Sequence, residues 1–335
     1  MSTAKLTPTD SMKWLLKREF WEHKGSMFWA PVVVAGLIVA LLGAGLSYGL
    51  AQHGLPMHME MNGRSIDRDA LATAMPAELR DTAAHVASGM YLASAAPLLP
   101  LLAVVVFFYC LGALYDERRD RSILFWKSLP VSDGMTVLSK VITAAVVAPV
   151  LTIGIATVSS LALLFIAGAA LSISGVNLFG AVLTSPDLYL SPLRLLALLP
   201  VYAVWALPTL GWLLLVSSWA RTKPFLWAIG VPVVTVIACA SINGILHKVA
   251  GMELVILPYV KYVVSAILTG VVPGAWFASH PGLLHGIDPR QGVVLGELVS
   301  ASYASLLQAD AWIGAALGAA MLFGAVRLRR WRDEG

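Results

Sequence analysis

The segment 115–140, YDERRDRSILFWKSLPVSDGMTVLSK, holds the residues best suited to specific recognition. It opens with charges of both signs from Asp116 to Arg121, and large apolar side chains follow as far as Pro130. The apolar stretch is too short to cross a bilayer, which takes about 20 residues. An exposed aromatic cluster rimmed by charge is typical of a protein-docking surface. An interfacial helix anchored on lipid headgroups by Trp126 explains the same residues equally well.

Two other patterns suggest chemistry. Residues 45–49, GLSYG, match the G-x-S-x-G nucleophile pattern, but that pattern needs a strand-to-helix turn and a histidine partner. Because Ser47 lies in an apolar run, we expect helix packing there. The imidazole of His58 and the thioethers of Met59 and Met61 are suitable ligands for copper(I). We favour packing for these three residues and expect no metal site.

The composition identifies the class of protein. The chain has 335 residues, of which 58% are hydrophobic and only 13% are charged, whereas soluble domains carry about 25% charged residues. So few charges cannot cover a soluble fold, so we expect lipid to cover much of the surface. The net charge of +4 comes from basic residues beside apolar runs, which act as topology signals and do not indicate nucleic-acid binding. Cys110 and Cys239 lie in separate apolar runs, and we expect no disulfide.

Apolar runs of membrane-spanning length predict six helices in an all-α integral membrane protein. They lie at about 29–50, 91–114, 141–167, 194–216, 225–246 and 309–326. A further apolar stretch, 254–278, contains Lys261 and is interrupted at Pro273-Gly274. We interpret it as an outer re-entrant element between spans five and six, packed against the bundle because irregular backbone needs shielding from lipid. The whole chain, 1–335, then forms one transmembrane domain.

The distribution of lysine and arginine predicts the orientation. Most of these residues fall in the N-terminal segment, in 115–140, between spans four and five, and in the C-terminal tail. By the positive-inside rule, both termini are expected in the cytoplasm. We expect the membrane to be the inner membrane of a bacterium. The outer segments are then 51–90 and 247–308, and the first is expected to hold a helix around 67–88.

The spans also exclude some functions. Their centres contain no Asp, Glu, Lys, Arg or His, although ion-coupled carriers normally place such residues in the membrane. The chain contains no Gly-Lys dipeptide and hence no Walker A phosphate loop. We therefore expect that it is not an enzyme that hydrolyses ATP, and that any energy for transport comes from elsewhere.

Residues 12–24, MKWLLKREFWEHK, predict an N-terminal amphipathic elbow helix on the inner leaflet. Apolar residues recur at spacings of three and four, although Glu19 interrupts their stripe. A simple basic flank that sets the orientation is the alternative. The residues expected at the membrane surface are Trp14, Lys17, Arg18 and Trp21.

Glu117, followed by SILFWKSLPVS at 122–132 and a helix entering a span, resembles the cytoplasmic loop of ABC-2 type permeases. These are the membrane subunits of a class of ATP-binding-cassette exporters. The close resemblance covers roughly 105–165, and the rest of the chain agrees in topology. In that family the loop carries a coupling helix that inserts into a groove on a separate ATP-binding subunit. The docking residues that the resemblance implies are Glu117, Ile123, Leu124, Phe125, Trp126, Leu129 and Pro130.

The resemblance implies a permease that pairs with itself or a related permease and with an ATPase subunit. ATP and Mg are expected on that partner, with no cofactor bound by this chain. The alternatives are an ATP-independent carrier or scaffold subunit of an assembly complex, and a membrane-embedded hydrolase built on Ser47. The substrate is not indicated by the sequence.

Overall fold

The computed structural model describes residues 7–53, 58–61, 64–67, 77–120, 131–173, 178–284 and 295–331. The predicted docking residues Ile123, Leu124, Phe125, Trp126, Leu129 and Pro130 lie outside these ranges, as do the side chains of His58, Met59 and Met61.

Up to residue 147 the described elements are helices and one pair of strands. The elements are α1 Pro8–Lys24, the π-helix η1 Gly25–Trp29, α2 Ala30–His53, α4 Ala77–Met90, the 3-10 helix η2 Tyr91–Ala95, α5 Leu98–Ala113, α6 Tyr115–Arg119, α8 Asp133–Ile142 and the π-helix η3 Thr143–Val147. Strands β1 His58–Met61 and β2 Arg64–Asp67 form an antiparallel hairpin with His58 opposite Asp67.

From residue 148 onward the regular elements of the described residues are all helices. The elements are α9 Ala148–Ile173, α10 Phe179–Thr184, α11 Pro186–Ala197, α12 Leu199–Trp219, α13 Pro224–Ala250, α14 Leu257–Thr269, α15 Ala275–Ser279, the 3-10 helix η4 Pro281–Leu284, α16 Leu295–Ser305 and α17 Ala309–Trp331.

Among the described residues, six helical segments are long and apolar enough to cross a membrane. They are Pro8–Gln52, Thr82–Arg119, Asp133–Ile173, Pro186–Trp219, Pro224–Val249 and Ala309–Trp331. The prediction of a multi-pass helical membrane protein is therefore confirmed. The hairpin β1–β2 was not predicted, and the helix expected around 67–88 begins at Ala77 and continues to Met90.

Helix α12 forms the centre of the core, and α17 packs closely along it. A methyl group on Gly211 would lie 2.4 Å from the backbone oxygen of Gly318. A methyl group on Gly318 would lie equally close to the backbone of Leu207. Small residues at such crossings let helix backbones approach each other closely. Van der Waals packing then drives the association of the helices, because lipid tails are as apolar as the side chains and leave no hydrophobic driving force between them.

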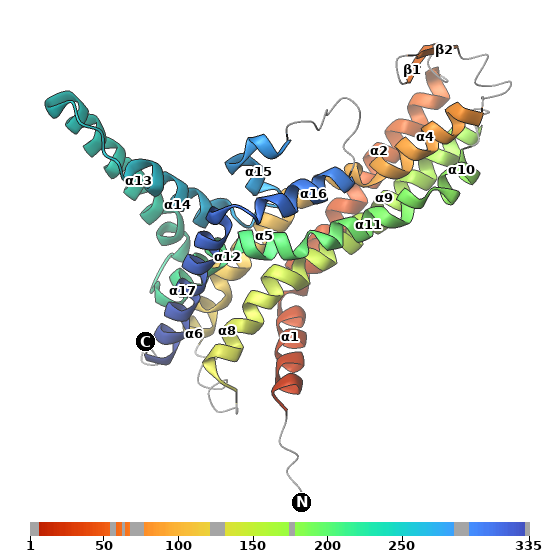
Figure 1. Cartoon of the computed structure of the whole chain (residues 1–335). Coiled ribbons are helices and arrows are strands. Elements are labelled where there is room, and N and C mark those ends of the chain that lie inside the picture. The colour runs from red at the N-terminus through yellow and green to blue at the C-terminus, as the bar shows by residue number, and fades with distance from the viewer. Residues whose placement is uncertain are drawn as a thin grey trace, which may run out of the picture.

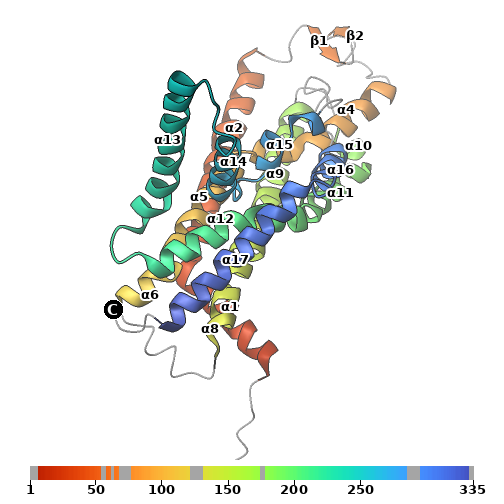
Figure 2. The same cartoon turned by 60° about the vertical axis from the view of Figure 1, so that its left-hand side comes forward.

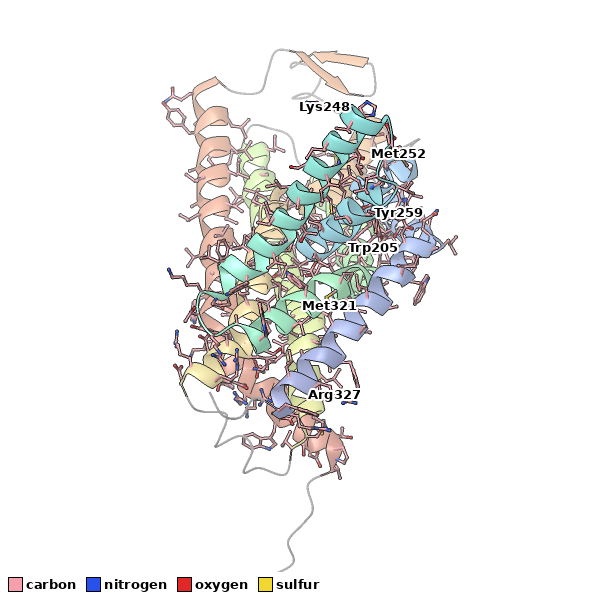
Figure 3. The ribbon with its side chains drawn as sticks, turned by 90° about the vertical axis from the view of Figure 1, so that its left-hand side faces the viewer. Trp205, Lys248, Met252, Tyr259, Met321 and Arg327 are labelled. Carbon is pink, nitrogen blue, oxygen red and sulfur yellow. The ribbon has the colours of Figure 1, made fainter. Side chains whose placement is uncertain are left out.

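The two ends of the bundle differ. In Figure 1 the N-terminal helix α1, the short α6 and the end of α17 lie at the bottom, and the hairpin β1–β2 lies at the top. Figure 3 shows Arg327 at the end that carries α1, and Lys248 and Met252 towards the end that carries the hairpin. Figures 1 and 2 both show α13 standing apart from the rest of the bundle, with α14 beside it.

The stretch 254–278 is not one continuous helix. Helix α14 ends at Thr269, and α15 begins after Gly274, whose φ of 86° favours glycine. Gly270 lies against α12, where a methyl group would lie 2.3 Å from the carbonyl oxygen of Trp205. The Thr209 hydroxyl donates a 2.8 Å hydrogen bond to the carbonyl of Ala266. The break in this apolar stretch is therefore packed against the core.

Candidate functional site

Six charged side chains from four elements meet where the chain enters and leaves the segment 121–130. We call them the loop-base cluster: Arg18, Glu19, Glu117, Asp133, Lys140 and Arg329. Three carboxylates face three cations, so the cluster is formally neutral. Unpaired charges are rarely buried because the loss of hydration costs several kcal/mol per ion, so the balance explains how these groups are accommodated.

Glu117 links three parts of the chain. It lies in α6, and the residue is only 6% exposed. Its Oε1 accepts from Arg18 Nη2 of α1 at 3.1 Å and lies 3.0 Å from Lys140 Nζ of α8. Its Oε2 accepts a hydrogen bond from Arg329 Nη1 of α17. One carboxylate therefore joins α6 to three other helices.

Lys140 and Glu19 form the most deeply buried pair of the cluster. Lys140 is 1% exposed and Glu19 is 0% exposed. Lys140 Nζ donates to Glu19 Oε1 at 2.9 Å, and the Tyr109 hydroxyl of α5 donates to Glu19 Oε2 at 2.7 Å. Both oxygens of the carboxylate are thus hydrogen-bonded, as a buried charge requires.

Arg329 also reaches the point where the chain leaves the segment 121–130. Its Nε donates to Asp133 Oδ1 at 3.1 Å, in the first turn of α8. Ser132 caps this helix, since its hydroxyl accepts from the Met135 amide at 3.2 Å. Because α6 ends at Arg119 and α8 begins at Asp133, the loop-base cluster holds the residues on both sides of the segment 121–130.

A second set of bonds ties α6 to the end of α12. The Ser217 hydroxyl accepts from the backbone amides of Leu114 and Tyr115 at 3.0 and 2.9 Å. Arg118 Nη2 donates to the carbonyls of Ser217 and Ala220 at 2.6 and 2.9 Å. A guanidinium here satisfies free carbonyls at the helix C-terminus and complements the helix dipole. Side chains therefore bond α6 to α1, α8, α12 and α17.

The predicted elbow residues divide between two environments. Trp14 and Trp21 are 68% and 57% exposed, and the ammonium of Lys17 lies 5.9 Å from the Trp14 ring centroid. Arg18 points inward, to Glu117 and to Glu22. Helix α1 continues into α2 through the π-helix η1, with a kink at His23. One sign of this inward-facing side is visible in the sequence, since Glu19 interrupts the apolar stripe.

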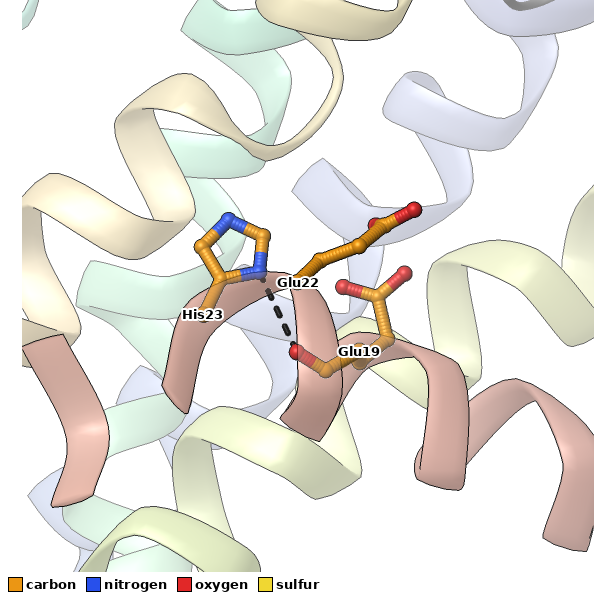
Figure 4. A group of neighbouring side chains, drawn as sticks. All are labelled: Glu19, Glu22 and His23. Carbon is orange, nitrogen blue, oxygen red and sulfur yellow. Dashed lines mark hydrogen bonds between the residues drawn. The ribbon is translucent and has the colours of Figure 1, made fainter. Parts of the chain in front are cut away.

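Glu19, Glu22 and His23 also form a group with the spacing of a metal site (Figure 4). One candidate ligand atom from each side chain lies within 4.8 Å of the other two. Each already has a partner inside the protein. Glu19 is bound by Lys140 and Tyr109, and Glu22 accepts from Arg18 Nε at 2.9 Å. His23 Nδ1 bonds the Glu19 carbonyl at 3.2 Å. We therefore interpret the group as an extension of the ion-pair network.

The pattern GLSYG at 45–49 lies inside the continuous helix α2, so it lacks the strand-to-helix turn of a nucleophile elbow. The candidate metal ligands His58, Met59 and Met61 belong to β1. Comparison of the chain with protein-family models, curated proteins and solved structures finds no match.

Proposed function

We propose that this chain is the membrane permease subunit of an ATP-driven exporter, with ATP hydrolysed by a separate subunit. The observation that carries the proposal is the loop 121–130. Its sequence resembles a coupling helix, and the flanking residues are fixed in a cluster that joins four elements of the bundle. An apolar, aromatic docking segment attached to such a cluster is suited to transmit the movement of a partner.

The proposed mechanism places ATP and Mg on the partner subunit. Binding of ATP closes the partner subunits. Residues 122–130 are seated in a groove of the partner subunit and move with it. The displacement enters α6 and α8 and reaches α1 and α17 through Glu117 and Arg329. It reaches α12 through Arg118 and Ser217. The partner shifts the permease between two conformations only if it contacts them differently, and the docked loop supplies that difference. The substrate passes between this chain and a second permease copy or a related permease.

The same proposal includes the topology. We assign the end of the bundle that carries α1, α6 and the end of α17 to the cytoplasm of a bacterial cell, because lysine and arginine gather there. The broken pair α14 and α15 then forms a re-entrant element on the outer side, and α1 forms the elbow at the inner leaflet. The contacts of Gly270 and Thr209 support a shielded position for this break.

Co-purification in mild detergent tests the proposal. The tagged wild-type chain should recover an ATP-binding-cassette subunit, and the double variant Phe125→Ala/Trp126→Ala should lose most of it. The control is Trp14→Ala/Trp21→Ala, which removes two exposed aromatic groups on α1 and should retain the partner. Equal recovery with the loop variant would show that the loop is not the docking site. Absence of an ATPase from the wild-type preparation would favour the carrier or scaffold alternative.

A further inference from the structure

A long apolar groove lies between α2 and α9, away from the loop-base cluster. It has a volume of about 650 Å³. Small residues of α2, among them Gly36, Ala40 and Ala44, form one side, and Ile155 and Ile166 of α9 contribute to the other. Ser47 and Ser159 are the polar residues of its lining. A volume of this size is within the range of small-molecule sites.

The groove is long enough to hold one extended hydrocarbon chain. Its lining runs from Phe28 of η1 to Ser47 of α2, which at 1.5 Å per residue is about 28 Å. The hydrocarbon core of a bilayer is about 30 Å thick. Both helices belong to apolar segments of spanning length, so the groove lies at the depth of the lipid chains.

The groove leads to a basic, aromatic region at its N-terminal end. Lys24 lies four residues before Phe28, it is exposed, and its ammonium lies 4.9 Å from the Trp21 ring centroid. Tryptophan is enriched at headgroup depth, and lysine beside the membrane attracts anionic lipids. Glu22, the acid in this turn of α1, is paired with Arg18. The charge at this end therefore complements an anionic headgroup.

We propose that the α2–α9 groove binds one acyl chain of an anionic phospholipid, with the lipid phosphate beside Lys24. The lipid comes from the leaflet on the N-terminal side of the protein. A second copy of this chain is the alternative occupant, and the oligomeric state of Ala40→Phe separates the two. The site involves no residue of the loop-base cluster or of the segment 121–130, so it holds whether or not an ATPase binds there.

Native mass spectrometry of the purified full-length chain, mixed with equal amounts of phosphatidylglycerol and phosphatidylcholine, tests the site. The wild type should retain phosphatidylglycerol preferentially. Ala40→Phe should fill the groove and lower retention of both lipids. Its control is Leu41→Phe, the neighbouring residue, which is 73% exposed and outside the lining. Lys24→Gln should reduce the preference for phosphatidylglycerol roughly fivefold, and the control Lys13→Gln should leave it unchanged.

Three results would overturn the proposal. The first is equal retention in Ala40→Phe and Leu41→Phe. The second is an unchanged headgroup preference in Lys24→Gln. The third is a change of oligomeric state in Ala40→Phe without a change in lipid binding, which would assign the groove to a second copy. Recovery of the ATPase should be the same in all four variants, so failure here is separable from failure of the proposed transport function.

Discussion

Replacement of Lys140 by methionine tests whether the loop-base cluster holds the inner framework together. Methionine is similar in length and keeps the aliphatic packing, but it removes the cation between Glu19 and Glu117. Glu117 keeps its bonds to Arg18 and Arg329. The Glu19 carboxylate keeps the hydrogen bond from the Tyr109 hydroxyl and loses the one from Lys140. The variant therefore removes the cation that is bonded to the buried Glu19 carboxylate.

The expected cost follows from the burial of this pair. Removing one partner of a buried ion pair destabilises a protein by about 3–5 kcal/mol. This lowers the folding equilibrium constant by roughly two to three and a half orders of magnitude, since about 1.4 kcal/mol corresponds to a factor of ten. The measurement is the folded fraction in mixed micelles as the proportion of SDS rises. Lys140→Met should lose its fold at a clearly lower proportion than the wild type.

Two further variants make the result specific. Glu19→Gln/Lys140→Met restores the charge balance and should be less destabilised than the sum of the two single variants, with a coupling of about 0.5–3 kcal/mol. Arg119→Gln removes an exposed cation that pairs with Asp116 and Asp120 and should unfold like the wild type. The reasoning is refuted if Lys140→Met behaves like Arg119→Gln, or if the two single effects add without coupling.

Two more predictions use the same unfolding assay. Gly318→Ala should cost about 1–3 kcal/mol, because the methyl group would meet the backbone of Leu207 in the α12–α17 contact. Gly154→Ala, where nothing lies within 4 Å, should be neutral or slightly stabilising, and equal behaviour of the two would contradict this packing. Ser217→Ala removes the acceptor for the amides of Leu114 and Tyr115 and should cost about 1–3 kcal/mol, and an unchanged stability would show that water replaces the hydroxyl.

The membrane character of the fold could be predicted from the sequence because it depends on local composition. A run of about 20 apolar residues is sufficient to identify a spanning helix, and six such segments are present. Proline and glycine mark the break in 254–278 for an equally local reason. The bounds were less accurate, since the helices continue through polar ends such as 327–331 that composition alone assigns to a tail.

The loop-base cluster could not be predicted in the same way. Glu19 and Lys140 are 121 residues apart, and Glu117 and Arg329 are 212 apart, so no spacing rule relates them. The sequence showed only an acid in an apolar stripe and a lysine at the start of an apolar run. Arg18 was predicted among the membrane-surface residues of the elbow, whereas the fold directs its guanidinium to Glu117. Pairings of this kind depend on how the helices assemble.

Site-specific photocrosslinking at position 125 tests the central claim most directly. A photoreactive amino acid replaces Phe125 in cells, and the products are identified after irradiation and purification. Our account predicts one protein adduct, an ATP-binding-cassette ATPase, and a sharp reduction of that adduct when Trp126 is also replaced by alanine. Adducts to lipid alone, or to a protein outside the cytoplasm, would contradict it.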